Sequence, residues 1–292
     1  MNYTNFDRKL MALHYAHPVP YNRLKKLVDA DPRLDQLFAY NPFQLSELLN
    51  ISFQQAKLLH EKLSKCANTP FAQLYEQQLI IPLPYSHSNY PEALRKLIDP
   101  PAVLYIKGDI SLLQIRTKIA IIGSRKATDY SRKAMSYIVP PLVQNGIAIV
   151  SGLAKGADTM AHEAALLYGG KTIAILGHGF FHLYPKENEK IAKTLSKEHL
   201  LLTEYPPYLS PARWTFPMRN RLISGFSDAV IITESEEKSG TMSTVEHALD
   251  HGKDIYAVPG PITSSLSFGP NKLIEEGAKP IWNGFQLFEH TL

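Results

Sequence analysis

The sequence predicts an α/β fold in which a doubly wound, mostly parallel sheet follows a small all-helical domain. From Lys118 onward, short continuous apolar runs alternate with helical segments, which is typical of strands covered on both faces. Glycines stand where those helices are expected to end. Before this region, residues 1–76 contain short helical patterns with clear N-terminal capping signals. Together these observations predict two domains of different architecture.

The first domain is expected over residues 1–76. Asn41-Pro42 is typical of a helix start, because a capping residue precedes a proline at the first helical position. Ser52 and Gln55 match a capping box that opens a second helix. Two helices joined by the tight Asn50-Ile51 turn resemble the SAM-like or helix–hairpin–helix units found beside DNA-binding domains. A helical packing module without a ligand is the alternative.

Residues 77–117 are expected to form an extension that packs on the sheet. An apolar run near residues 80–83 is broken by prolines, a helix starts at Tyr90-Pro91, and a strand is expected at 102–106. Residues 118–292 then form the Rossmann-like domain. Its strands are expected near 119–122, 147–150, 172–176, 200–203, 229–232 and 254–258. Its helices are expected near 130–145, 157–168, 187–198, 217–226 and 241–251.

Composition excludes several classes of protein. The 292 residues include a single cysteine, Cys66, which rules out an internal disulfide and a cysteine metal cluster. No apolar run is long enough to span a membrane, and the first residues lack the apolar core of a signal peptide. A cytoplasmic location is therefore expected. The net charge of +4 does not by itself indicate a nucleic-acid binder.

Four glycine-bearing loops follow four strand-like runs, and three of them carry a cation. Loops after successive parallel strands open at one edge of the sheet, where ligands bind. Small residues let backbone N–H groups approach an anion, and the following helix offers its positive N-terminus. The repeated pattern indicates an extended anion such as a phosphodiester chain. The loops are Gly123-Ser124-Arg125, Gly152 to Gly156 with Lys155, Gly177-His178-Gly179 with Lys186 and Asn188, and Ser239-Gly240-Thr241.

Cofactor and metal sites are not expected. Neither a G-x-G-x-x-G fingerprint nor a G-x-x-x-x-G-K-[ST] loop is present, which argues against NAD and Mg-ATP. His247 and His251 have helical spacing, but no third ligand accompanies them, so a plain helix face is favoured over a metal site. His162 and Asp158 are interpreted as a core residue and a helix cap.

Aromatic and basic residues are concentrated at two places. Phe180 and Phe181 precede Tyr184-Pro185-Lys186, and aromatic rings beside a lysine suit single-stranded nucleic acid, so both are candidates for base stacking. The alternative is that they are core residues. The segment from Arg213 to Arg221 is the densest cationic patch. Within it Arg219 and Arg221 point in different directions on a helix, so we expect at least one of them to be structural.

These motifs resemble the DprA/Smf family of DNA-processing proteins. The resemblance covers about residues 120–280, with the motifs in the family's order. They are Gly-Ser-Arg (123–125), Ser-Gly-Leu-Ala-Lys-Gly-Ala-Asp (151–158), Ala-His (161–162), Tyr-Pro-Lys-Glu-Asn (184–188), Glu-Tyr-Pro (204–206), Phe-Pro-Met-Arg-Asn-Arg-Leu-Ile-Ser-Gly (216–225), Ser-Gly-Thr (239–241), Ala-Val-Pro-Gly (257–260) and Gly-Pro-Asn-Lys-Leu-Ile (269–274). Two departures are Ala157 in place of a larger aliphatic residue and the Gly-His-Gly loop at 177–179. The family's winged-helix C-terminal domain is not expected here.

The resemblance implies a cytosolic single-stranded DNA-binding protein of natural transformation. Such proteins protect incoming strands and help to load the RecA recombinase past single-strand-binding protein. They act as homodimers joined through the Rossmann-like domain, without established catalysis. Residues matching the family's DNA-contacting positions are Arg125, Lys186 and Arg213. The wider set expected to bind DNA or phosphate is Gly123, Ser124, Arg125, Lys155, Lys186, Asn188, Arg213, Arg219, Asn220, Arg221, Ser239, Gly240 and Thr241.

A nucleotide phosphoribohydrolase is the alternative function. Rossmann-like enzymes of that kind carry a Gly-Gly-x-Gly-Thr-x-x-Glu loop. Here Gly240-Thr241 is followed by Glu246, two positions beyond the required carboxylate, and no Pro-Gly-Gly precedes the loop. A carboxylate moved by two helix positions points elsewhere. The sequence therefore favours a binding protein over an enzyme.

Overall fold

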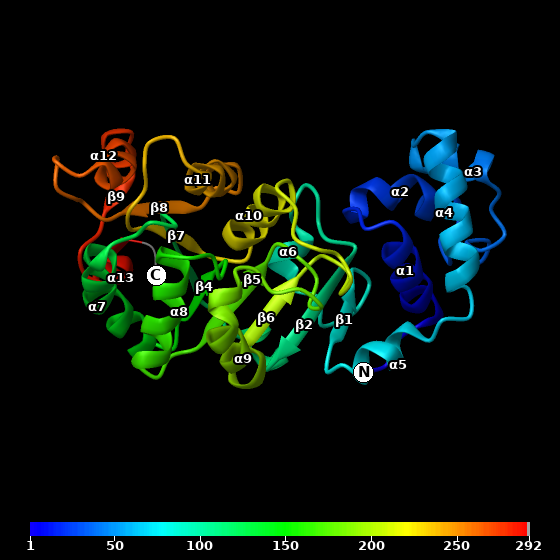
Figure 1. Cartoon of the computed structure of the whole chain (residues 1–292), viewed down its shortest axis with the longest axis horizontal. Helices are drawn as coiled ribbons and strands as arrows, with labels where there is room; N and C mark the ends of the chain where they lie inside the picture. Colours follow the sequence, from blue (N-terminus) through cyan, green and yellow to red (C-terminus); the bar gives the residue numbers. More distant parts are fainter. Residues whose placement is uncertain (291–292) are drawn as a thin grey trace. The chain divides into compact units, whose positions relative to one another are not determined.

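The computed structural model describes residues 1–290 and divides into two units by its internal contacts. The first contains residues 1–106 and 204–208, and the second contains residues 107–203 and 209–292. Figure 1 labels their helices and strands. Within residues 1–290, no helix combines the length and the apolar character needed to cross a membrane. The three-part division at residues 76 and 117 stays a prediction, because contact groups do not show which parts fold independently.

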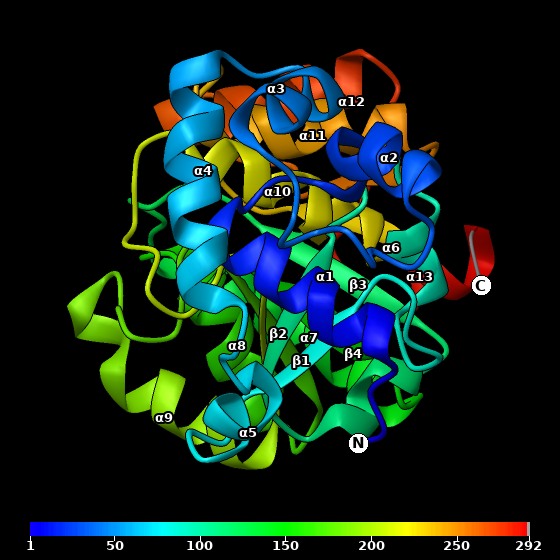
Figure 2. The same ribbon diagram turned by 90° about the vertical axis from the view of Figure 1, so that its right-hand side faces the viewer.

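Helices make up the start of the first unit. They are α1 (Asn5–Ala16), α2 (Tyr21–Ala30), α3 (Pro42–Leu49), α4 (Phe53–Cys66) and α5 (Phe71–Glu76) (Figure 2). Both expected caps are present: Asn41 exchanges hydrogen bonds with Gln44, and Ser52 does so with Gln55. Asn50 closes α3 in the left-handed conformation, with φ of 51°, and so forms the tight turn into α4.

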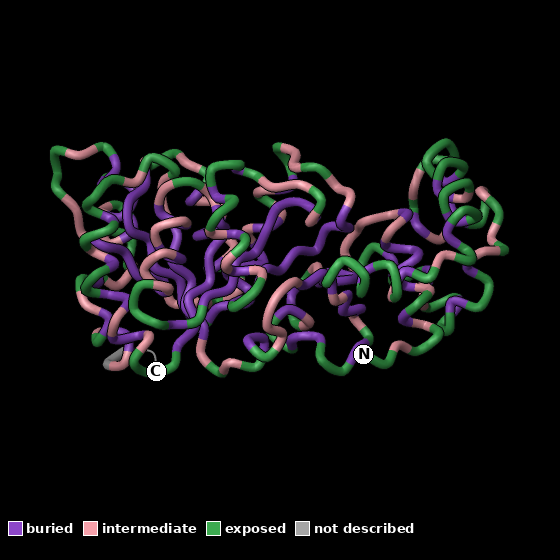
Figure 3. The backbone as a smooth tube through the Cα atoms, turned by 60° about the horizontal axis from the view of Figure 1, so that its bottom comes forward, coloured by how far each residue is buried: buried purple, intermediate pink, exposed green. Residues whose placement is uncertain are grey.

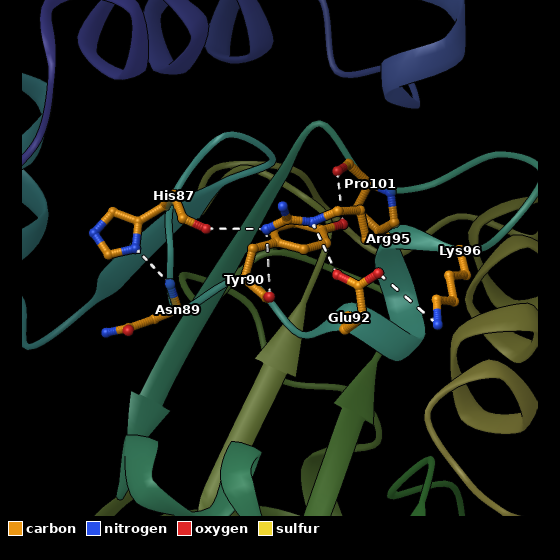
Figure 4. Close-up of polar contacts among 7 residues, drawn as sticks. All are labelled: His87, Asn89, Tyr90, Glu92, Arg95, Lys96 and Pro101. Carbon is orange, nitrogen blue, oxygen red and sulfur yellow. Dashed lines mark hydrogen bonds and ion pairs between the residues drawn. The ribbon is translucent and has the colours of Figure 1, made fainter.

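A two-stranded antiparallel ribbon completes this unit. Strand β1 (Ile81–Pro84) pairs with β2 (Val103–Gly108), and α6 (Glu92–Arg95) lies between them in the chain. The Arg95 guanidinium lies 5.4 and 5.5 Å from the ring centroids of Tyr85 and Tyr90. It donates to the His87 carbonyl oxygen at 3.1 Å (Figure 4). These contacts fix the loop that leads from β1 into α6.

The second unit contains a parallel sheet whose strand order confirms the doubly wound fold. Seven strands are ordered β6-β5-β4-β3-β7-β8-β9, all parallel. The chain runs outward from β3 to β6, returns to place β7 beside β3, and continues outward the other way. The strands are β3 (Lys118–Ile122), β4 (Ala148–Ser151), β5 (Thr172–Leu176), β6 (Leu200–Thr203), β7 (Ala229–Ile232), β8 (Asp254–Ala257) and β9 (Lys279–Pro280).

Helices cover both faces of this sheet, as right-handed crossovers in two directions require (Figure 1). One face carries α7 (Asp129–Gln144), α8 (Ala157–Leu167) and α9 (Glu189–Glu198), and the other carries α10 (Thr215–Gly225), α11 (Gly240–Asp250) and α12 (Phe268–Glu275). The short elements are η1 (Ile110–Gln114), η2 (Lys186–Asn188), η3 (Ser265–Ser267) and α13 (Gln286–His290). Buried backbone runs through the interior of each unit (Figure 3).

The expected helix ends are confirmed in the second unit. Gly146, Gly169 and Gly252 follow α7, α8 and α11 with φ of 70°, 73° and 63°. This left-handed conformation is where glycine costs least. The core beneath α7 and α8 contains fully buried aliphatic residues from β3, β4 and β7, which include Ile121, Ile149 and Ile231. The loops that leave these strands are therefore attached to a rigid scaffold.

Candidate functional site

A cleft opens where the strand order reverses. Strands β3 and β7 are neighbours, but their loops lead to α7 and α11 on opposite faces, so the loops diverge at this edge. The cleft has a volume of about 570 Å³. Most of the predicted phosphate-binding residues line it, namely Gly123, Ser124, Arg125, Arg213, Arg219, Asn220, Ser239, Gly240 and Thr241. Lys155 lines a smaller pocket that shares Arg125 with the cleft.

The loop after β3 is held by the loop after β7. The Ser124 amide donates to the Glu234 carbonyl oxygen at 2.6 Å. The buried Glu234 carboxylate accepts hydrogen bonds from the Thr128 amide at 2.7 Å and the Ser131 hydroxyl at 2.8 Å. A Cβ on Gly123 would lie 2.8 Å from the Glu234 carbonyl oxygen, so this close approach requires glycine. The loop is thus fixed before any ligand binds.

Arg125 projects from this fixed loop. Its side chain is exposed, and its guanidinium carbon lies 5.6 Å from the centroid of the Phe216 ring. Within residues 1–290 its side chain has no ion pair or hydrogen bond. Arg213, which is also exposed, lines the same cleft and likewise has no acidic partner in the part of the chain that the structure describes. Two guanidinium groups can therefore bind an anion here without first breaking an ion pair.

Arg219 has a structural role, as expected for at least one arginine of the patch. It is 4% exposed, and its Nη1 donates to the Gly152 carbonyl oxygen at 2.6 Å and to the Ile175 carbonyl oxygen. Asp158 accepts from the Gly152 amide at 3.1 Å. Burial raises the pKa of the Asp158 carboxyl, against the opposing effect of Arg219. Arg221 is also buried. DNA contact by either arginine stays a prediction.

The loop after β5 places its polar residues in different environments. Lys186 is exposed and has no ion pair in the described structure, whereas Lys155 lies 2.6 Å from the Glu187 carboxylate. Asn188 is buried, and its amide donates to the Leu153 carbonyl oxygen and the Thr159 hydroxyl, both at 2.8 Å. The geometry gives Asn188 a role in holding this loop against α8. Its contact with DNA stays a prediction.

The two phenylalanines of this loop do not line the cleft. Phe180 packs against the core between the sheet and α9, and Lys107 lies 5.5 Å from its ring centroid. The Phe181 side chain is 55% exposed. The alternative of a core residue therefore fits Phe180 but not Phe181, and base stacking by either stays a prediction.

The loop after β7 presents the start of α11. The Ser239 hydroxyl bonds the Ser235 hydroxyl at 2.7 Å and does not cap the helix. A Cβ on Gly240 would meet no atom within 4 Å, so this end of the helix is open. The Asn220 amide donates to the Gly240 carbonyl oxygen at 3.4 Å. Uncapped amides at a helix N-terminus attract anions. At the rim, Lys126 pairs with Glu236 at 3.3 Å.

Sequence reasoning missed the two aromatic rings that do line the cleft. Tyr184 and Phe216 lie with ring centroids 5.5 Å apart, and both contribute to its wall. Each is close in sequence to a predicted cation, Lys186 or Arg213. This proximity to a predicted cation could have indicated them, but the adjacent Phe180 and Phe181 were predicted as the stacking residues instead.

Metal ligands are not grouped within residues 1–290: no three His, Cys, Asp or Glu side chains there are arranged to hold an ion. The ring centroids of His247 and His251 are 6.3 Å apart, and His251 Nδ1 lies 3.0 Å from the Ser224 hydroxyl.

Comparison with known proteins identifies the family. The model of the DNA recombination-mediator protein A family matches residues 82–291. The chain belongs to this family. The DNA processing protein DprA of Bacillus subtilis is 44% identical over 215 residues, which cover 74% of this chain and 72% of that protein. DprA of Streptococcus pneumoniae is 43% identical over 195 residues, covering 67% of this chain and 68% of the relative. The resemblance to DprA/Smf proteins is therefore confirmed.

Solved structures of DprA proteins share the fold. The X-ray structure of S. pneumoniae DprA matches with a TM-score of 0.84 and 32% identity, over 100% of this chain and 99% of that one. The Helicobacter pylori DprA structure, described for its single-stranded DNA binding mode, matches with a TM-score of 0.65 and 35% identity. This match covers 72% of the present chain and 94% of the H. pylori chain.

Proposed function

We propose that this chain binds single-stranded DNA in the cleft between the loops that follow β3 and β7, and passes the strand to the recombinase RecA. The observation that carries the proposal is the set of exposed cations at one sheet edge. Arg125, Arg213 and Lys186 come from three different loops, and none has an acidic partner within residues 1–290. The single-stranded DNA binding described for the H. pylori relative supports the same ligand.

The proposed contacts are to phosphates. Arg125 and Arg213 supply forked donors, and the open N-terminus of α11 supplies backbone amides. Lys186 is exposed on the loop after β5 but does not line the cleft, so it supplies a further charge outside the cleft. Phosphate contacts carry no base information, so binding is expected to be largely independent of sequence. The fixed β3 loop keeps Arg125 in place before the strand arrives, which lowers the ordering cost of binding.

In our proposal the complex protects incoming strands during natural transformation in the cytoplasm. A homodimer would present two clefts, and the linked binding events favour long strands over short ones. Contacts that are mainly electrostatic can be exchanged one at a time, which suits transfer of the strand past single-strand-binding protein. The proposal includes no catalytic step.

The proposal is tested by comparing a labelled oligo-dT with a duplex of equal length in equilibrium binding. We expect tighter binding to the single strand. Arg125→Ala should weaken that binding about tenfold, whereas Arg132→Ala should not, because Arg132 pairs with Glu163 at 2.9 Å on the face formed by α7 and α8. Equal affinity for duplex, or an equal loss in both variants, would contradict the proposal. Release of free base from nucleoside monophosphates would support the hydrolase alternative.

A further inference from the structure

We propose that the exposed face of Tyr184 is a stacking platform for one nucleobase of the bound strand. This inference rests on the proposed function and adds a base contact to the phosphate contacts described above. The side chain of Tyr184 is 45% exposed and lines both the cleft and the smaller pocket beside it. An aromatic ring at such a position can stack on any base, because every base has a flat face.

The ring of Tyr184 packs against a second aromatic ring. Its centroid lies 5.5 Å from that of Phe216, with an angle of 49° between the rings. Phe216 in turn lies against the loop after β5, where a Cβ on Gly177 would be only 2.9 Å from the Phe216 ring. The lack of a side chain at residue 177 therefore lets Phe216 approach the loop closely. The platform is a packed unit rather than a loose surface side chain.

His178 fixes the backbone of Tyr184. The Tyr184 amide donates to Nε2 of His178 at 3.3 Å, and the Nδ1 of the same ring lies 3.0 Å from the Gly179 carbonyl oxygen. The neutral tautomer with its proton on Nδ1 satisfies both contacts. The imidazole is 1% exposed, so the arrangement is shielded from water. Because the backbone at Tyr184 is already held, little backbone conformational entropy is lost when a base stacks on the ring.

The platform lies beside the phosphate-binding groups. Arg125 packs over Phe216 at 5.6 Å, so the aromatic pair and the guanidinium occupy one wall. The hydroxyl of Tyr184 has no hydrogen bond within residues 1–290 and remains available to water or to a base edge. Phe181 is also exposed, but it lines neither the cleft nor the pocket. Of the aromatic residues in this loop, Tyr184 therefore has the geometry that stacking requires.

The test compares oligo-dT with an abasic strand that has the same number of phosphates. Stacking predicts that the wild-type protein binds oligo-dT about tenfold more tightly than the abasic strand. Tyr184→Ala should remove this difference by weakening oligo-dT binding alone. Tyr184→Phe should retain it, because the ring is kept. Tyr137→Ala is the matched control and should leave both affinities unchanged, because this exposed tyrosine on α7 lines neither the cleft nor the pocket.

The outcomes separate this inference from the proposed function. Two results would contradict stacking on Tyr184 but leave the proposed strand binding intact. They are equal wild-type affinity for oligo-dT and the abasic strand, and a loss of affinity for both strands by the same factor in Tyr184→Ala. If neither strand binds, the proposed function itself fails. Thermal unfolding of each variant by circular dichroism identifies a change that acts through folding, and Tyr184→Phe then decides whether the ring itself is needed.

Discussion

Nη1 of Arg219 lies 2.6 Å from the carbonyl oxygen of Gly152, and the guanidinium occupies the space that a side chain at residue 152 would need. A Cβ on Gly152 would lie 2.6 Å from the Arg219 guanidinium carbon. The same Nη1 donates to the Ile175 carbonyl oxygen, so one buried arginine joins the ends of β4 and β5. The floor of the cleft therefore depends on a glycine and an arginine that are 67 residues apart.

Gly152→Ala should destabilise the protein, because the added methyl group displaces the guanidinium from both carbonyl oxygens. We expect the free energy of unfolding in urea to fall by about 2 kcal/mol. Gly240→Ala is the control, since a Cβ there meets nothing within 4 Å, and its effect should stay within about 0.5 kcal/mol. Equal effects of the two substitutions would show that the Arg219 contact does not restrict residue 152.

Neutralising the acids at the rim should strengthen DNA binding. Glu236 lines the cleft and pairs with Lys126 at 3.3 Å, and Glu187 pairs at 2.6 Å with Lys155 of the adjoining pocket, so each acid neutralises a cation next to the proposed path of the strand. Glu236→Gln and Glu187→Gln should each raise the affinity for oligo-dT about threefold, in line with the strength of exposed charge pairs. Glu163→Gln, which frees Arg132 instead, should have no effect. Unchanged binding by the rim variants would place these acids outside the path of the strand, and weaker binding would contradict the predicted direction of the effect.

The buried His162 should make the free energy of unfolding depend on pH. The Thr172 hydroxyl donates its proton to the Ile149 carbonyl oxygen, so Nδ1 of His162, 2.6 Å away, must donate to Thr172. Nε2 is then the unprotonated nitrogen, and it has no hydrogen-bond partner in the described part of the chain. Burial lowers the pKa of His162 from 6.5 to about 3, with smaller contributions from His199 and Arg219.

The unfolded chain takes up this proton below pH 6.5, whereas the folded protein does so only near pH 3. The free energy of unfolding should therefore fall with decreasing pH across this window, with about 1.4 kcal/mol per pH unit from His162. His162→Gln should make the slope between pH 6 and pH 4 shallower by about that amount in urea titrations. A slope identical to that of the wild type would contradict the assignment of a buried neutral imidazole.

Much of the second unit could be predicted because its signals are local. Continuous apolar runs and glycines after helices mark strands and helix ends without knowledge of tertiary contacts, and the observed bounds of β5, β6 and β7 match the expected ones. The capping boxes at Asn41 and Ser52 are equally local and are confirmed. The alternation of strands and helices already predicts a parallel sheet. In such a sheet the loops after successive strands open at the same edge, so the meeting of the four loops could also be predicted.

The environments of individual site residues could not be predicted in the same way. Arg213 and Arg219 lie in one cationic segment, yet the first is exposed and the second is buried against two carbonyl groups. That difference arises from Gly152 and Ile175, which are remote in sequence. Asn188 likewise follows Lys186 by two residues but faces Leu153 and α8. Burial and hydrogen bonding of this kind depend on which strands become neighbours, so a linear motif does not contain them.

The salt dependence of oligo-dT binding tests the central claim most directly. For phosphate contacts on a single strand, the logarithm of the association constant should fall linearly with the logarithm of salt concentration, with a slope of about −0.7 per contact. Arg125→Ala should make this slope shallower by about 0.7, and Arg132→Ala should leave it unchanged. A wild-type affinity that does not vary with salt, or an unchanged slope in Arg125→Ala, would contradict a phosphate-binding cleft centred on Arg125.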